Sequence, residues 1–160
     1  MNKPTTQPYS LLPQSLELLE IVFDTIPMGI VVYSEDGITR THVNQSFCDF
    51  IGYSRQEILT ETYGKLTVED DLDESLDSRQ KLRSGEVDHY VLKKRYRHKK
   101  GHIVWGEVES TVLRDTDGGT LNYVSFVRDI TEDKEHQEAL QASEKRFKTL
   151  IDNSNQGIML

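Results

Sequence analysis

The chain has 160 residues, 36% hydrophobic and 29% charged, so it can hold one well-packed soluble domain with attachments but not two full average domains. Its formal net charge of -8 argues against general affinity for nucleic acid or an anionic membrane surface. Its longest apolar run is residues 28–33, far short of the roughly 20 residues that cross a bilayer, so we expect no membrane span in this segment. Its single cysteine excludes a disulfide framework, so we expect a cytoplasmic protein.

The N-terminal region divides into a tail and a helix. Residues 1–11 combine prolines and threonines with few apolar groups, which predicts a disordered tail. Residues 12–27 predict an N-terminal flanking helix that ends at Pro27, because the residue before a proline is pushed out of helical geometry. The apolar residues of this helix recur at a spacing that places them on one face: Leu16, Leu19, Phe23 and Ile26.

Residues 28–131 predict one domain that begins and ends with strands. Residues 28–34 and 38–43 form the first two strands, joined by a turn at Glu35-Asp36-Gly37. Short helices follow from the caps Asn44 and Ser54, and residues 69–85 predict a longer helix. The last three strands then cover residues 89–97, 103–114 and 120–129.

The strand at 103–114 indicates how the sheet is arranged. Val104, Val108 and Val112 alternate with polar residues, which is typical of an antiparallel strand with one buried face. The element order is two strands, short helices, three strands and a helix capped by Thr131. It therefore predicts an α+β fold in which a five-stranded antiparallel sheet carries its helices on one face.

The C-terminal region repeats the beginning of the chain. A shift of 128 residues places Asp24 on Asp152 and residues 29–30 on 157–158, with matching apolar positions around them. We therefore expect residues 132–146 to be a helical connector and residues 147–160 to be the truncated start of a second domain of the same kind.

Ordered short motifs run through most of the chain. They are Gly29-Ile30-Val31-Val32, Asp36-Gly37, Val43-Asn44-Gln45-Ser46-Phe47, Gly52-Tyr53-Ser54, Lys100-Gly101, Arg114-Asp115-Thr116-Asp117-Gly118 and Val127-Arg128-Asp129-Ile130-Thr131-Glu132. In this order they resemble the PAS family, including its C-terminal PAC stretch. The resemblance implies a non-enzymatic sensory module of a bacterial multi-domain signalling protein. Its output domain, such as a sensor kinase or diguanylate cyclase domain, would lie outside this chain.

The resemblance also implies a cleft between the helices and the sheet. The residues that could line it, or form an ordinary core there, are Phe47, Phe50, Ile51, Tyr63, Leu66, Tyr90, Leu92, Lys94, Val104 and Val108. Strand alternation points Lys94 inward if Leu92 and Tyr96 also point inward. A buried lysine needs a carboxylate partner or an anionic ligand.

No particular cofactor is indicated. A flavin photosensor of this family would need a reactive cysteine after Leu59, whereas Cys48 lies earlier and is expected to be an inert buried thiol. Haem needs an axial ligand, usually histidine, and residues 69–85 contain none. The histidines lack metal-ligand spacing, and no set of residues has the spacing of a catalytic site.

The expected signal relay is the junction between the last strand and the final helix. The resemblance implies that Asp129 and Thr131 fix this junction by polar contacts, with Ile130 as an apolar anchor. Leu140 and Phe147 are seven residues apart, so the connector and flanking helices predict a parallel homodimer. Two hypotheses stay open: a module that senses a ligand or relays a signal to downstream domains, and a ligand-free dimerisation scaffold.

Overall fold

The computed structural model describes residues 13–157; the expected tail at 1–11, Leu12 and residues 158–160 lie outside the described residues. The elements in chain order are α1 (Pro13–Thr25), β1 (Gly29–Tyr33), β2 (Arg40–Val43), α2 (Gln45–Ile51), α3 (Arg55–Thr60), α4 (Tyr63–Leu66), the 3-10 turn η1 (Glu69–Asp71), α5 (Leu72–Ser84), β3 (His89–Arg97), β4 (Ile103–Arg114), β5 (Thr120–Asp129) and α6 (Thr131–Gln156).

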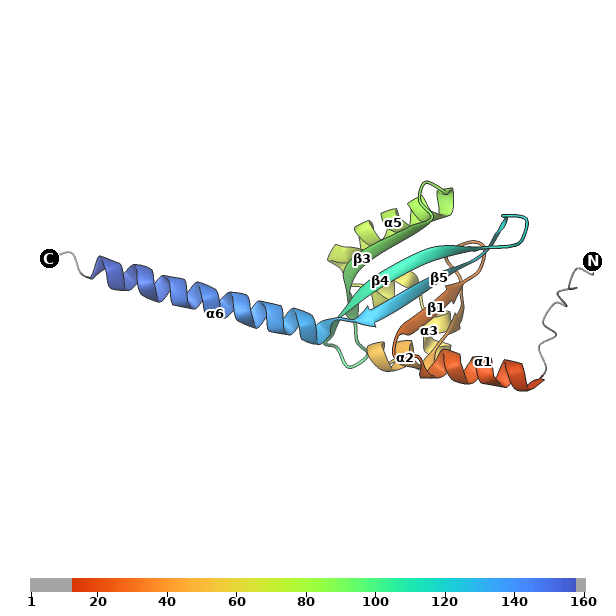
Figure 1. Ribbon diagram of the computed structural model, residues 1–160, viewed down its shortest axis with the longest axis horizontal. Coiled ribbons are helices and arrows are strands. Elements are labelled where there is room, and N and C mark those ends of the chain that lie inside the picture. Colours follow the sequence, from red (N-terminus) through yellow and green to blue (C-terminus); the bar gives the residue numbers. More distant parts are fainter. Residues whose placement is uncertain (1–12, 158–160) are drawn as a thin grey trace, which may run out of the picture.

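The five strands form one sheet in the order β2-β1-β5-β4-β3, and every neighbouring pair is antiparallel. β1 and β5 join the N-terminal hairpin to the C-terminal three-stranded meander. Helices α2 to α5 lie on one face of this curved sheet (Figure 1). The predicted α+β class with a five-stranded antiparallel sheet is confirmed.

Two predicted element boundaries were wrong for local reasons. The second strand starts at Arg40 rather than at residue 38, because the Asp36 carboxylate accepts hydrogen bonds from the backbone N–H groups of Ile38 and Thr39 and holds them in a turn. The long helix predicted at 69–85 begins as the 3-10 turn η1, and its α-helical part starts only at Leu72.

The sheet face beneath the helices carries the hydrophobic core. The predicted alternation along β4 is confirmed, since Val104 and Val108 are buried together with Gly106 and Ser110. The buried hydroxyls of Ser110 on β4 and Ser125 on β5 form a hydrogen bond with each other at 2.6 Å. Burial of each large apolar side chain contributes about 1.5–3 kcal/mol to folding.

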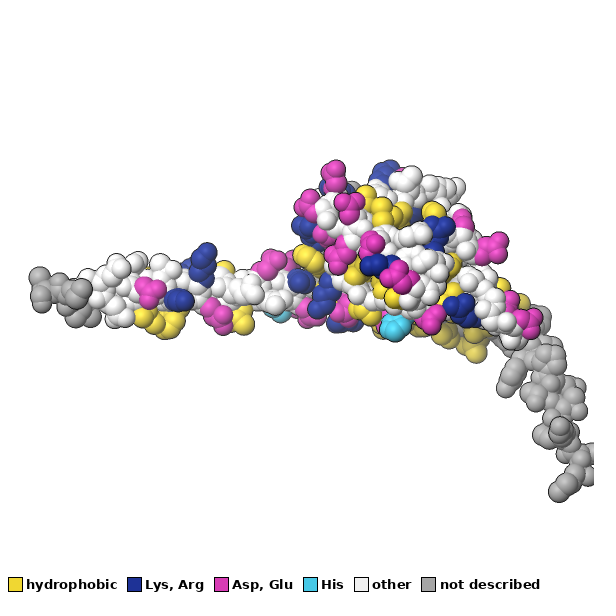
Figure 2. Space-filling view, turned by 90° about the horizontal axis from the view of Figure 1, so that it is seen from above, with side chains coloured by type: hydrophobic (Ala, Val, Ile, Leu, Met, Phe, Trp, Pro, Cys, Tyr) yellow, Lys and Arg dark blue, Asp and Glu magenta, His cyan; other side chains and the backbone are white. Residues whose placement is uncertain are grey.

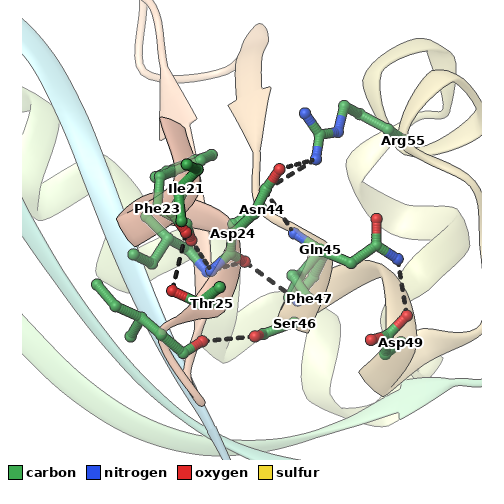
Figure 3. Close-up of polar contacts among 12 residues, drawn as sticks. Ile21, Phe23, Asp24, Thr25, Asn44, Gln45, Ser46, Phe47, Asp49 and Arg55 are labelled. Atoms are coloured by element: carbon green, nitrogen blue, oxygen red, sulfur yellow. Dashed lines mark hydrogen bonds and ion pairs between the residues drawn. The ribbon is translucent and has the colours of Figure 1, made fainter. Parts of the chain in front are cut away.

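Asn44 fastens α1 to the domain (Figure 3). Its side chain is fully buried, and its amide donates to the carbonyls of Phe23 and Met28, both at 2.9 Å. Its carbonyl accepts from the N–H groups of Ile30 at 2.8 Å and Phe47 at 3.1 Å, the second bond capping α2. One side chain therefore ties the end of α1 to the first strand and to the first helix of the domain.

Helix α6 leaves the sheet directly after β5 and projects away from the domain (Figure 1). It runs without interruption through Gln156, across the boundary expected between residues 146 and 147, and none of its residues is buried. The division into a connector and a second domain stays a prediction. Among the residues that the structure describes, no helix has the length and apolarity needed to cross a membrane.

Candidate functional site

Three basic side chains from three different elements meet between the helices and the sheet. Arg40 on β2, Arg79 on α5 and Lys94 on β3 are only 9%, 7% and 3% exposed. We call them the cationic cluster. Basic side chains are almost never buried to this extent without partners, so their surroundings decide what this region can do.

Lys94 points inward, as the strand alternation predicted. Its ammonium group donates to three hydroxyls: to Tyr63 at 2.8 Å, Ser75 at 3.1 Å and Thr67 at 3.3 Å. All three N–H donors of the lysine are thereby used. Its hydrogen bonds are satisfied, but the hydroxyls carry no formal charge to balance the ammonium.

Arg79 comes from the opposite side of the same space. One terminal nitrogen donates to the carbonyl of Gly37 at 2.6 Å, and its guanidinium carbon lies 4.1 Å from the centre of the Tyr33 ring and 4.5 Å from that of Tyr63. Its Nε is buried without a partner. An unsatisfied buried donor of this kind costs about 1–3 kcal/mol.

Arg40 is turned inward by an irregularity in the hairpin. The β1–β2 register shifts between Val32 and Tyr33, so both Arg40 and Val43 are buried although they are three residues apart. The guanidinium donates to the carbonyls of Ile58 at 3.0 Å and Glu61 at 2.7 Å, where it supports the end of α3.

Within residues 13–157 no carboxylate forms an ion pair with the cationic cluster. The phenol of Tyr63 contacts two of its members, Lys94 and Arg79. Burial raises the pKa of this phenol, but the charges of Lys94 and Arg79 and its hydrogen bond from Lys94 outweigh burial and lower the pKa to about 7. Tyr63 can thus supply part of the missing negative charge.

The space inside the cluster is small. The inner cavity has a volume of about 10 Å³, room for about one water molecule, so in this arrangement a flavin or haem ring does not fit. Its walls are Val31, Tyr33, Arg40, Phe47, Tyr63, Leu66, Thr67, Arg79, Lys94, Tyr96, Val108, Ser125 and Val127.

Of the ten residues predicted to line the cleft, Phe47, Tyr63, Leu66, Lys94 and Val108 line this cavity. The other five, which do not, are Phe50, Ile51, Tyr90, Leu92 and Val104. Ile51 and Val104 are buried in the core, and the other three pack against it, partly buried.

Two of the three basic residues were missed by the sequence analysis. Arg79 could have been found, because Leu72, Ser75, Arg79 and Leu82 recur at i, i+3, i+7 and i+10 and so share one face of α5. Arg40 had no such signal, since its direction depends on the register shift.

A larger outer pocket of about 430 Å³ lies on the other side of Tyr63 and Arg79. Both residues line the inner cavity as well. The remaining walls of the outer pocket are Ile38, Leu76, Asp77, Gln80 and Arg83. Arg79, itself a member of the cationic cluster, therefore borders both spaces.

The strand–helix junction is held to β4 through the backbone of Trp105. Its N–H donates to the Thr131 hydroxyl at 3.0 Å, and its carbonyl accepts from the N–H of Ile130 at 2.9 Å. Ile130 is buried, and the Asp129 carboxylate accepts from the N–H of Thr131 at 2.9 Å. The ammonium group of Lys134, one turn into α6, lies 4.5 Å from the centre of the Trp105 ring.

One row of the sheet connects the cationic cluster to this junction. Lys94 on β3 is paired with Gly106 on β4, and Gly106 is paired with Asp129 on β5. In the next row, Arg95 is paired with Trp105. Lys94, which binds Tyr63, and Asp129, which precedes the start of α6, thus lie in one row of the sheet with only Gly106 between them.

The residues considered for cofactors lie elsewhere. Cys48 is buried on α2, and burial raises the pKa of its thiol, which disfavours the reactive thiolate. Across residues 13–157, no group of three or more His, Cys, Asp or Glu side chains is arranged to hold a metal ion.

The fold and its strand–helix junction define a PAS domain, and the family comparison agrees. The model of the PAS domain family matches residues 27–132, so the chain belongs to the PAS domain family of signalling modules.

Two curated proteins are similar in sequence. The chain is 35% identical over 104 residues to the probable diguanylate cyclase DgcE of Escherichia coli, a match that covers 65% of this chain and 9% of that protein. It is 30% identical over 150 residues to the bacterioopsin transcriptional activator of Halobacterium salinarum, covering 89% and 21%. The chain thus spans at most about a fifth of the curated relatives it matches.

Solved structures share the fold. The PAS domain of an HTR-like protein from Haloarcula marismortui is 27% identical with a TM-score of 0.59, covering 73% of this chain and 93% of that one. A PAS domain from Colwellia psychrerythraea is 22% identical with a TM-score of 0.63, covering 73% and 98%. These likenesses show the architecture and not a ligand.

Proposed function

We propose that this PAS module senses a small ligand beside the cationic cluster and relays the signal to a downstream output domain through α6. The observation that carries the proposal is the sheet row from Lys94 through Gly106 to Asp129. A change in the contacts of Lys94 shifts β3 against β4, and β4 holds the first residues of α6 through Trp105.

The module would work as a two-state element. A ligand shifts an equilibrium between two arrangements of α6 only by its difference in affinity for them. The junction offers contacts that can differ between such states: the hydrogen bond from Trp105 to Thr131 and the packing of Lys134 on the Trp105 ring. The output domain, for which the match to a probable diguanylate cyclase gives one example, would lie outside this chain in the cytoplasm.

A test of the relay uses hydrogen exchange on the purified chain. Lys94→Met perturbs the cluster, and we expect altered exchange at the N–H groups of Ile130 and Lys134 at the start of α6. Lys93→Met is the matched control, since its side chain lies on the opposite face of β3 and is about half exposed. A change confined to the neighbours of residue 94 would contradict the relay.

A second candidate function is a ligand-free dimerisation scaffold. Large apolar side chains are exposed on α6, among them Leu140 and Phe147, and Figure 2 shows hydrophobic side chains gathered on the part of α6 that projects from the domain. Exposed apolar residues are also present on α1, including Leu16 and Leu19. We propose a homodimer through these helices in either case; the scaffold differs in having no ligand.

A further inference from the structure

The balance of charge around Tyr63 is incomplete. Lys94 and Arg79 each lie 4.5 Å from the centre of the Tyr63 ring, and both are more than nine-tenths buried. Within residues 13–157, neither forms an ion pair with a carboxylate. Buried charges in stable proteins are paired with opposite charges.

Arg79 also has an unused donor. Its Nε is buried and unpartnered, while a terminal nitrogen already binds the carbonyl of Gly37. A guanidinium presents its nitrogens as a planar fork that matches a carboxylate. The free position of this fork is the kind of donor that an anionic group would satisfy.

Tyr63 stands between the cluster and the outer pocket, since it lines both spaces. It belongs to α4, which has only four residues and is flanked by the extended residues Thr62 and Thr67. The Tyr63 side chain can therefore turn, with a small shift of α4, without disturbing a long helix. Because the inner cavity has room for about one water molecule, an anion reaches Lys94 only when the phenol moves aside.

The outer pocket indicates what else the ligand carries. Ile38 and Leu76 give it apolar, solvent-exposed walls, which suit a compact hydrocarbon body. Asp77 and Arg83 also line the pocket, and Asp77 forms an ion pair with Lys81 at 2.8 Å, so the charges of the walls offset one another. The apolar walls therefore favour an acid with a hydrocarbon body over inorganic phosphate.

We propose that Arg79 and Lys94 bind the carboxylate of a small apolar monocarboxylic acid, which displaces the Tyr63 hydroxyl and places its hydrocarbon body between Ile38 and Leu76. This inference rests on the ligand sensing proposed above and names its ligand class. In this proposal the ligand carboxylate supplies the negative charge that no carboxylate of the described residues gives to Arg79 and Lys94.

The test titrates the 160-residue chain with benzoate, cyclohexanecarboxylate and hexanoate by calorimetry and thermal unfolding. Benzyl alcohol serves as the uncharged analogue of benzoate, and inorganic phosphate as the anion without an apolar body. We expect saturable binding of at least one monocarboxylate, at least about tenfold tighter than the alcohol or phosphate. Lys94→Met and Arg79→Met should lose this preference, and Lys93→Met should keep it.

A measurement on the free protein checks the variants. The circular dichroism spectra of Lys94→Met and Arg79→Met without ligand should match that of the parent chain, so that lost binding reports on the site. No binding of any of the three acids to the parent chain, or an unchanged preference for them in both folded variants, would overturn the inference. Equal binding of benzyl alcohol and benzoate would overturn the assignment of an anionic ligand but leave the proposed ligand sensing intact. Hydrogen exchange at the N–H groups of Ile130 and Lys134 tests the relay separately.

Discussion

The backbone N–H of Trp105 donates a hydrogen bond to the hydroxyl of Thr131 at 3.0 Å, so the first residue of α6 accepts from the middle of the sheet. The N-cap residue Ile130 makes no side-chain cap, and the Thr131 hydroxyl accepts from the neighbouring strand. The Thr131 side chain thereby links the start of α6 to the position of β4.

We expect Thr131→Val to weaken this link, because valine has nearly the same shape but offers no acceptor to the N–H of Trp105. The expected loss of stability is about 1–3 kcal/mol, that of an unsatisfied buried donor, with faster hydrogen exchange at Trp105 and Lys134. Thr149→Val is the matched control on the same helix, since its hydroxyl bonds only the carbonyl of Lys145. Equal effects of the two variants would show that the junction has no special role.

Gly106 lies in the sheet row between the cluster and the junction, and it leaves no room for a side chain. An added Cβ would lie 2.8 Å from a ring carbon of Tyr96 and 2.9 Å from a methyl carbon of Val127. We expect Gly106→Ala to destabilise the fold by about 1–3 kcal/mol, the cost of overpacking, in chemical denaturation. Gly64→Ala should be nearly neutral, since its closest contact would be an ordinary 3.5 Å to Leu72; a similar loss there would contradict the packing argument.

Asn44 is the buried link between α1 and the domain, so its replacement should destabilise both the end of α1 and the start of the domain. Asn44→Ala leaves the N–H groups of Ile30 and Phe47 and the carbonyls of Phe23 and Met28 without this partner. We expect a loss of about 2–4 kcal/mol in unfolding free energy, with faster proteolysis of α1. Gln45→Ala is the control, because its exposed side-chain amide bonds only the Asp49 carboxylate. If Gln45→Ala lost as much stability as Asn44→Ala, Asn44 would not be the link between α1 and the domain.

The parts of the fold that follow from local patterns could be predicted from sequence. Alternation along β4 assigned Val104 and Val108 to the core, and the same rule turned Lys94 inward. The capping residues Asn44 and Ser54 marked the starts of α2 and α3, where their side chains do accept from Phe47 and Glu57. Periodicity succeeds at such positions because the direction of a side chain is set by its own element.

The cationic cluster could not be predicted as a whole, because it depends on packing between distant elements. The register shift in the β1–β2 hairpin turns Arg40 inward, and no local pattern reveals it. The partners of Lys94 come from α4, α5 and the segment between α4 and η1, and they lie 19 to 31 residues before it in the chain. Of the two partners expected for this lysine, a carboxylate is not found within residues 13–157, where three hydroxyls meet it, and an anionic ligand stays a prediction.

The exposed apolar side chains of α6 predict self-association. Phe147 is 66% exposed, and Leu140 and Leu150 are exposed on the same helix. We expect analytical ultracentrifugation to show a dimer at high concentration and Phe147→Glu to shift it towards monomer, because a charge in an apolar seam opposes burial. Gln141→Glu adds the same charge at a polar position and should leave the dimer intact; a strict monomer at high concentration would reject the proposed interface.

The phenol of Tyr63 predicts a rise in stability at alkaline pH. Its pKa lies near 7 in the folded chain, lowered from its ordinary value of 10.0 because the charges of Lys94 and Arg79 outweigh the opposing effect of burial. Between pH 7 and pH 10 the unfolded chain therefore binds one more proton at this residue than the folded chain does. Stability rises with pH wherever the unfolded state binds more protons.

Denaturation curves of Tyr63→Phe and the parent chain across this pH range isolate the effect, since every other titrating group is present in both. We expect the stability difference between them to change in favour of the parent as pH rises, and to level off above pH 10, where the phenol is ionised in both states. Tyr53→Phe, a partly buried tyrosine outside the cluster, should follow the parent. A difference between Tyr63→Phe and the parent that does not vary with pH would mean that the two cations do not stabilise a tyrosinate.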